Sequence, residues 1–190
     1  MTRALSIAIN LTLYAWVSCA SAKECRGVDF PDRLQVAGQE LNLNGLGVRK
    51  ATFLKVNVYV AALYVSHPAR DGTSLISSTD PQQLTLQFVR NVSKDQLTDA
   101  WQEGFEKVAK DQMPALKPRI ERLNSWMTDI KTGQRLTFTR TSNSIDVNVN
   151  GVAKGSIEGA DFSRAFLAIW LGDAPPNPEL KAGLLGGSCE

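Results

Sequence analysis

Arg49, Asn57 and Tyr59 bring three kinds of hydrogen-bonding group into one short stretch of this sequence. Arg49 follows a turn broken by glycines, and Asn57 and Tyr59 follow it on a run of valines typical of a β-strand. Because side chains alternate along a strand, Asn57 and Tyr59 should share one face. A permanently charged guanidinium beside an amide and a phenol predicts a site for an anionic or carbonyl oxygen. Spacing alone leaves a second interpretation open, in which Arg49 pairs with a surface carboxylate and Tyr59 is an ordinary strand residue.

Other kinds of site lack the residues that they need. His67 is the only histidine and precedes a proline, so neither a histidine metal site nor a Ser-His-Asp triad is expected. The pair Gly45 and Gly47 lacks the third glycine of a phosphate-binding loop and does not lead into a helix. We therefore expect no metal and no cofactor. The net charge of +2 is too small to favour a nucleic acid as partner.

Residues 1–22 have the pattern of a secretory signal peptide. The start is basic, residues 4–17 are largely apolar, and Ala20-Ser21-Ala22 fits the small-residue cleavage motif. Lipidation at Cys19 is the alternative. Trp16, three residues before this cysteine, disfavours it because tryptophan is a poor residue at that position of a lipobox. No later segment is apolar for long enough to span a bilayer, so no transmembrane segment is expected.

Two cysteines, Cys25 and Cys189, remain in the expected mature chain, residues 23–190, which we predict to be a single domain. In an oxidising compartment this pair can close almost the whole chain into a ring. A loop of this length contributes roughly 5 kcal/mol in the chain-entropy model. Two free thiols are the alternative. A disulfide fits the secreted or periplasmic location that cleavage near Ala22 predicts.

Hydrophobic periodicity predicts strands, then helices, then strands, then helices. Ser93 and Gln96 form a capping box that begins the first helix. Pro114 should end or bend this helix, and a second one should follow from about Pro118. Asn150-Gly151 predicts a two-residue hairpin turn between two late strands. This order indicates an α+β protein, in which a large antiparallel sheet carries a layer of helices on one face. The strands are expected over residues 33–66, 84–89, 135–141, 144–149 and 152–157, and the later helices over 162–171 and 178–184.

The order of several motifs resembles that of the chalcone isomerase family. The motifs are Gly45-Leu46-Gly47-Val48-Arg49, then Phe53 to Val60 and Leu63-Tyr64-Val65, and near the end Leu171-Gly172-Asp173 and Pro178-Glu179-Leu180-Lys181. The likeness is greatest to the bacterial, secreted chalcone-isomerase-like proteins, which are related to plant fatty-acid-binding members of the fold. It implies an open-faced sandwich, in which helices cover one face of a large antiparallel sheet.

The resemblance also assigns the residues with which chalcone isomerases act. Arg49 matches the family's arginine, and Asn57 falls at or next to its strand threonine. The positions of the family's tyrosine, asparagine and late threonine fall on Leu97, Gly104 and Ile169. Without these donors a pocket cannot activate an enone through a hydrogen-bonded water. The resemblance thus favours a protein that binds without catalysis.

In the fatty-acid-binding branch, an arginine and a tyrosine on the neighbouring strand hold the carboxylate. Arg49 and Tyr59 match this pair, with Asn57 beside them and Tyr64 as the alternative tyrosine. Trp170 is the aromatic residue most readily assigned to the pocket, whose apolar walls would bind a tail at ~0.8 kcal/mol per buried CH₂. We therefore expect an exported, non-catalytic binding protein for a fatty acid or a similar small amphipathic carboxylate. Two alternatives stay open, an isomerase or intramolecular lyase on a non-chalcone substrate and an envelope interaction module with a vestigial cleft.

Overall fold

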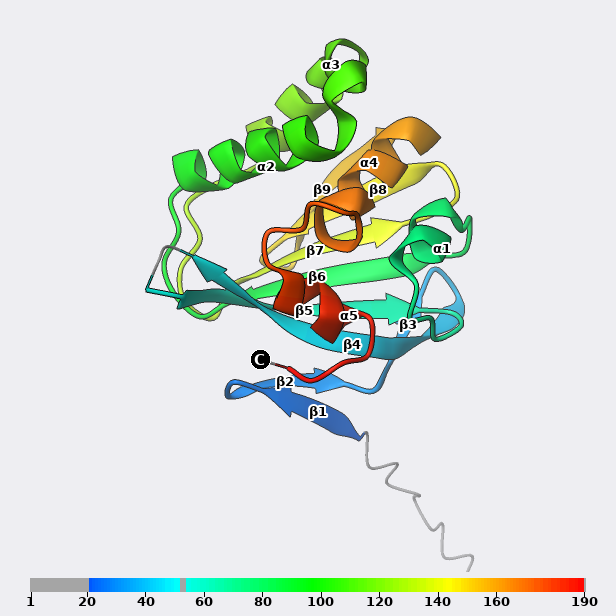
Figure 1. Ribbon diagram of the computed structural model, residues 1–190, viewed down its shortest axis with the longest axis vertical. Helices are drawn as coiled ribbons and strands as arrows, with labels where there is room; N and C mark the ends of the chain where they lie inside the picture. The colour runs from blue at the N-terminus through cyan, green and yellow to red at the C-terminus, as the bar shows by residue number, and fades with distance from the viewer. Residues whose placement is uncertain (1–20, 52–53, 190) are drawn as a thin grey trace, which may run out of the picture.

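A curved, seven-stranded antiparallel sheet forms the centre of the molecule (Figure 1). The computed structural model describes residues 21–51 and 54–189, so the predicted signal peptide up to residue 20, including Cys19, lies outside the described residues. The spatial order of the strands follows their order in the chain. They are β3 (Arg33–Val36), β4 (Gln39–Ala51), β5 (Val56–Val65), β6 (Gln82–Phe88), β7 (Arg135–Arg140), β8 (Ser144–Val149) and β9 (Val152–Glu158).

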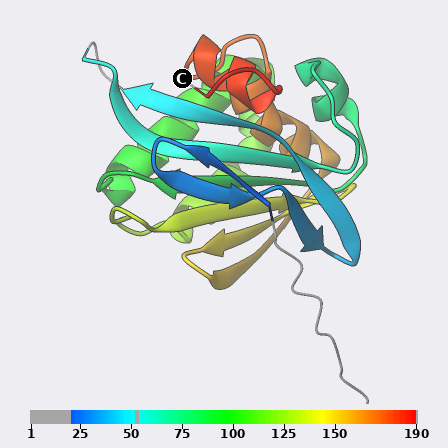
Figure 2. The ribbon, with the colours of Figure 1, turned by 90° about the horizontal axis from the view of Figure 1, so that it is seen from below.

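Helices cover one face of this sheet, which confirms the predicted α+β sandwich (Figures 1 and 2). They are α1 (Gly72–Ser77), α2 (Lys94–Ala109), the 3₁₀ helix η1 (Lys110–Gln112), α3 (Met113–Ser125), α4 (Ala160–Leu171) and α5 (Pro178–Leu184). The main core lies between the two layers, where Leu63, Leu86 and Phe138 from the sheet meet Phe105 and Phe166 from the helices. None of the described helices is long and apolar enough to cross a bilayer.

A short hairpin that the sequence pattern did not predict covers part of the opposite face of the sheet (Figure 2). It consists of β1 (Ala22–Cys25) and β2 (Val28–Pro31), and its Phe30 packs into a second, smaller core. Cys25 lies at disulfide distance from Cys189, with the two Cα atoms 6.1 Å apart. The predicted cysteine pair is thus brought together, and it links the hairpin to the segment that follows α5.

Helices α2 and α3 meet at a break that lies earlier in the chain than predicted. The capping box at Ser93 begins α2 as expected, but α2 ends at Ala109, whose φ of −143° leaves the helical region. Pro114 lies in the first turn of α3, where the missing N–H would have no partner within the helix, and Pro118 lies inside α3. The expectation that Pro114 ends or bends the first helix and that the next begins near Pro118 is therefore wrong.

Gly45 and Gly47 lie inside strand β4 and not in the turn that the sequence suggested. A Cβ atom at Gly45 would stand 2.1 Å from the carbonyl oxygen of Gly183, and one at Gly47 would stand 2.4 Å from that of Leu180. The two glycines therefore let the backbone of helix α5 touch the backbone of β4. This contact also brings the segment before α5 beside Arg49, near the end of the same strand.

Candidate functional site

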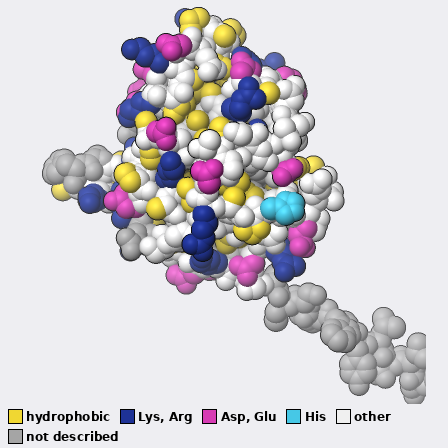
Figure 3. All heavy atoms as spheres, turned by 45° about the vertical axis from the view of Figure 1, so that its right-hand side comes forward, with side chains coloured by type: hydrophobic (Ala, Val, Ile, Leu, Met, Phe, Trp, Pro, Cys, Tyr) yellow, Lys and Arg dark blue, Asp and Glu magenta, His cyan; other side chains and the backbone are white. Residues whose placement is uncertain are grey.

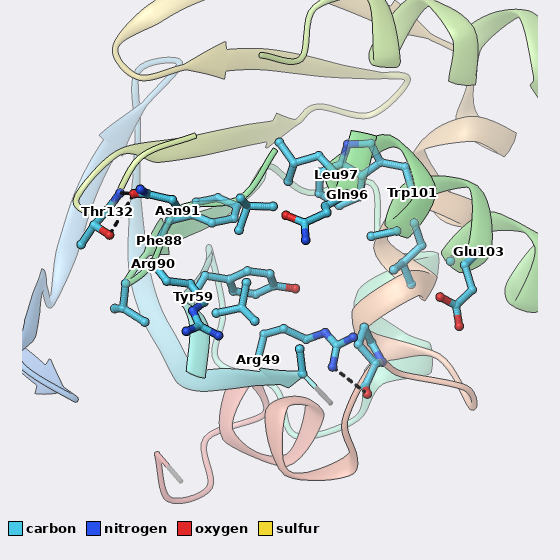
Figure 4. Close-up of a pocket in the computed structure, with 18 of the residues that line it drawn as sticks. Arg49, Tyr59, Phe88, Arg90, Asn91, Gln96, Leu97, Trp101, Glu103 and Thr132 are labelled. Atoms are coloured by element: carbon cyan, nitrogen blue, oxygen red, sulfur yellow. Dashed lines mark hydrogen bonds between the residues drawn. The ribbon is translucent and has the colours of Figure 1, made fainter. Parts of the chain in front are cut away.

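A cavity of about 790 Å³ opens between one end of the sheet and helix α2 (Figure 4). Strands β4, β5 and β6, helices α2 and α4, and the segment between α4 and α5 all contribute to its lining. Its size lies within the range of ~300–1,000 Å³ that is usual for pockets that hold small organic ligands. Its apolar lining residues include Val58, Phe88, Leu97, Trp101, Ile169 and Pro176. Its polar lining residues are Arg49, Tyr59, Arg90, Asn91, Gln96, Glu103, Lys107 and Thr132.

Tyr59 presents a neutral hydroxyl group to this cavity (Figure 4). The residue is 8% exposed, and its hydroxyl oxygen accepts a hydrogen bond of 3.0 Å from Nε1 of Trp170. Burial raises the pKa of Tyr59 to about 12, although the bond from Trp170 and the charge of Arg49 oppose this rise. The phenol therefore keeps its proton at neutral pH, and it donates that proton to none of the described residues. It remains available as a donor to a ligand.

Arg49 lies at the edge of the cavity with one side of its guanidinium group already engaged. Nη1 donates to Oδ1 of Asn177 at 3.1 Å, to the carbonyl oxygen of Pro176 at 3.4 Å and to that of Lys50. Nε and Nη2 have no hydrogen-bond partner among the described residues, and no ion pair found there includes Arg49. The surface ion pair that the sequence left open is thus not formed within the described chain. The free Nε–Nη2 edge has the geometry that binds a carboxylate through two parallel hydrogen bonds.

A β-bulge separates Asn57 from the other two polar residues. Arg49 is paired with Tyr59, whereas Lys50 is paired with Asn57, so that Val58 is the extra residue in β5. Strict alternation ends at this bulge, and both Val58 and Tyr59 line the cavity. Asn57 is not among the lining residues. Alternation along the strand predicted that Asn57 and Tyr59 share one face. The structure instead leaves Asn57 outside the cavity that Arg49 and Tyr59 line.

Trp170 lies behind the cavity and is not part of its lining. It is 1% exposed, holds the hydroxyl of Tyr59 and packs against Trp101, with the two ring centroids 5.7 Å apart. Trp101 forms the cavity wall in its place. Tyr64, the alternative tyrosine, belongs to the smaller core on the other face of the sheet, where its hydroxyl donates to Pro31 at 3.0 Å. Tyr59 is therefore the tyrosine that reaches the cavity.

Six polar residues of the lining were not predicted as site residues. They are Arg90 and Asn91 in the loop after β6, Gln96, Glu103 and Lys107 on α2, and Thr132 in the loop before β7. Nζ of Lys107 lies 2.5 Å from Oε1 of Glu103, and this hydrogen bond, more than the charge of Arg49, lowers the pKa of Glu103. Arg90 forms no ion pair with a described residue. The cations at the rim thus outnumber the single carboxylate of Glu103, which favours the approach of an anion.

Residues 22–186 match the family model of chalcone isomerase-like proteins. The chain belongs to the chalcone isomerase-like family. A solved structure with the same fold is that of a fatty-acid binding protein from Arabidopsis thaliana, with a TM-score of 0.69 and 15% sequence identity. The likeness covers 87% of this chain and 96% of the plant chain, and at this identity it establishes the fold. No protein with a curated function matches this sequence.

Three positions that the family resemblance assigns to polar residues of chalcone isomerases lie at this cavity. Leu97 and Gly104 on α2 and Ile169 on α4 all belong to the lining. A Cβ atom at Gly104 would meet Cγ2 of Ile169 at 3.0 Å, so the isoleucine occupies the space beside the glycine. These positions therefore present hydrocarbon to the cavity where the family's enzymes present hydrogen-bonding groups.

His67 is exposed at the surface and does not line this cavity (Figure 3). Within residues 21–51 and 54–189, no group of His, Cys, Asp and Glu side chains could hold a metal ion. The polar side chains that line the cavity carry guanidinium, ammonium, carboxylate, amide, phenol and hydroxyl groups.

Proposed function

We propose that this protein is a non-catalytic binding protein for a fatty acid or a similar amphipathic carboxylate. The observation that carries the proposal is a pair of unused donors at one cavity, the O–H of Tyr59 and the Nε–Nη2 edge of Arg49. A carboxylate only accepts hydrogen bonds, so it complements donors that have no acceptor among the described residues. The Arabidopsis protein of the same fold, a fatty-acid binding protein, supports this class of ligand.

The two halves of such a ligand have separate binding regions. The carboxylate would lie on Arg49 and Tyr59, where each hydrogen bond to a charged group contributes about 1.5–3 kcal/mol. The tail would lie along Val58, Phe88 and Leu97, where each buried CH₂ contributes ~0.8 kcal/mol. A compound that lacks either half should therefore bind much more weakly than one that has both.

The absence of catalysis is part of the proposal. Leu97, Gly104 and Ile169 offer no donor that could hold a water molecule against a reacting carbonyl. The phenol of Tyr59 is a weak acid here, because its pKa is raised to about 12. These residues suit a ligand that is held unchanged.

Titration with laurate, together with native mass spectrometry of the protein purified from cells, tests this function. We expect Arg49→Met to weaken laurate binding by about a hundredfold or more, because it removes both hydrogen bonds of the Nε–Nη2 edge to the carboxylate. Arg90→Met is the matched control, because it removes a rim arginine that forms no ion pair with a described residue, and we expect less than about a threefold change from it, as for a screened surface charge. A clean apo mass together with no measurable laurate affinity would contradict the proposed function.

We further propose that the protein is exported, with cleavage near Ala22. The pattern of residues 1–22 and the cysteine pair Cys25–Cys189, which suits an oxidising compartment, support this location. Cell fractionation followed by intact mass measurement should find a chain that begins at Lys23 in the secreted or periplasmic fraction. Full-length protein with free thiols in the cytosolic fraction alone would contradict export.

A further inference from the structure

The side-chain amide of Asn177 is bound on both sides to the end of strand β4. Its Oδ1 accepts from the backbone N–H of Lys50 at 2.8 Å, and its Nδ2 donates to the carbonyl oxygen of Lys50 at 3.1 Å. The amide thus pairs with Lys50 much as a neighbouring strand would. The same Oδ1 also accepts from Nη1 of Arg49 at 3.1 Å. One side chain therefore fixes both the backbone after Arg49 and the guanidinium group itself.

Asn177 stands where an asparagine ordinarily has a different partner. It is the N-cap residue of α5, and asparagine is favoured at that position because its oxygen accepts from the first N–H groups of the helix. Here no hydrogen bond from the side chain caps the helix. Its hydrogen-bonding capacity is directed to Arg49 and Lys50 instead. Helix α5 therefore has no side-chain N-cap hydrogen bond, and Arg49 has a hydrogen-bond partner in Asn177.

The chain on either side holds Asn177 in this position. Pro176 and Pro178 flank it, and proline restricts both its own φ and the conformation of the preceding residue. The backbone of Asn177 is extended, with φ of −148° and ψ of 135°. Pro176 also lines the cavity, and its carbonyl oxygen is 3.4 Å from Nη1 of Arg49. The segment between α4 and α5 is therefore both a wall of the cavity and the support of Arg49 (Figure 4).

We propose that Asn177 is the positioning residue of the carboxylate site. It holds Nη1 of Arg49, and so leaves the Nε–Nη2 edge in one orientation for the carboxylate. A free arginine side chain loses rotamer entropy when it binds, whereas one that is already held loses less. Asn177 therefore increases the affinity for a charged head group without touching it. This inference rests on the proposed function and adds a residue that the ligand does not contact.

Paired variants and paired probes separate positioning from a general structural role. Asn44 is the matched control, since its amide also ties β4 to α5, with Nδ2 2.7 Å from the carbonyl oxygen of Leu184, and it does not line the cavity. The probes are laurate and dodecanol, which share a tail and differ in the charge of the head group. We expect Asn177→Ala to weaken laurate by about tenfold and to leave dodecanol unchanged, because only the charged head group needs an oriented arginine. Asn44→Ala should change neither probe.

Asn177→Asp provides a second variant if the alanine variant does not fold. Its carboxylate can still accept from Lys50 and Arg49, but it neutralises the guanidinium and repels a second carboxylate. Laurate should then bind at least as weakly as to Asn177→Ala, while dodecanol again binds as to the wild type. An equal loss of both probes, or no loss of laurate in either variant, would overturn the positioning role.

Side-chain NMR of Arg49 tests the same inference without any ligand. In the wild type, the two Nη groups of Arg49, assigned by their loss in Arg49→Lys, should exchange slowly because one of them is held. Asn177→Ala should make them exchange faster, because Nη1 then keeps only the carbonyl oxygens of Lys50 and Pro176 as acceptors, and Asn44→Ala should not. Should the wild type fail to bind laurate while this pattern holds, the proposed function fails and the positioning of Arg49 stands. Slow exchange that persists in Asn177→Ala overturns the inference whether or not laurate binds.

Discussion

Replacing Tyr59 with phenylalanine removes one oxygen atom and leaves a buried donor without its partner. Trp170 is 1% exposed, and its Nε1–H donates to the hydroxyl of Tyr59 at 3.0 Å. A buried donor that loses its acceptor costs about 1–3 kcal/mol. We therefore expect Tyr59→Phe to lower the free energy of unfolding at pH 7 by about 2 kcal/mol. Laurate binding should weaken as well, because the cavity loses its neutral donor.

The same variant should alter the stability of the protein at alkaline pH. Burial raises the pKa of Tyr59 from 10.0 to about 12. Below pH 10 both the folded and the unfolded chain hold this proton, so the stability linked to the raised pKa is fully present. Above pH 10 the unfolded chain releases the proton first, and the free energy of unfolding falls by ~1.4 kcal/mol per pH unit until about pH 12. Tyr59→Phe lacks this contribution and should lose less stability over the same range.

Urea unfolding at pH 7, 10 and 11, followed by circular dichroism, measures both effects. Tyr64→Phe is the matched control for laurate binding, since the hydroxyl of Tyr64 donates to Pro31 on the opposite face of the sheet. It should leave the laurate affinity unchanged. The reasoning is refuted if Tyr59→Phe and the wild type have equal free energies of unfolding at pH 7 and the same loss between pH 10 and 11.

Three further perturbations test other contacts of the fold. Arg119 beside Asp161 lowers the pKa of that carboxyl to about 2. The stability that this pair contributes is therefore present above about pH 4 and is lost as the pH falls towards 2. Asp161→Asn should lack this acid-dependent loss in urea unfolding at pH 6, 4 and 3. Reduction of Cys25–Cys189, which are 164 residues apart, should lower the thermal midpoint, with a cost of at most roughly 5 kcal/mol, as calorimetry with and without a phosphine reductant would show. Gly45→Ala should lower the free energy of unfolding in urea by about 3 kcal/mol, because its new Cβ atom would stand 2.1 Å from a carbonyl oxygen of α5. An unchanged unfolding midpoint would count against that contact.

Features that depend on a few neighbouring residues were predictable from the sequence. The capping box at Ser93 and the turn at Asn150-Gly151, where both residues have positive φ, are formed as expected. At the turn that joins β1 to β2, Arg26 and Gly27 also both have positive φ, 52° and 76°. It was missed because an arginine replaces the asparagine or aspartate that usually marks such a turn.

The candidate site was predictable only where one strand determines it. Arg49 and Tyr59 were identified from their own segment, and both line the cavity. Asn57 was misplaced because the bulge at Val58 depends on the pairing of β5 with β4, which no local pattern reports. Glu103, like Lys107, lies on the polar side of α2, and the sequence offers no sign that this side meets a cavity instead of solvent alone.

The hydrogen bond between Arg49 and Asn177 joins residues that are 128 positions apart in the chain. A ribosome must therefore finish almost the entire polypeptide before the arginine acquires its fixed orientation. Chains that end before Asn177 contain Arg49 yet cannot form this hydrogen bond. If the proposed function holds, such fragments bind a fatty acid more weakly than the complete chain does.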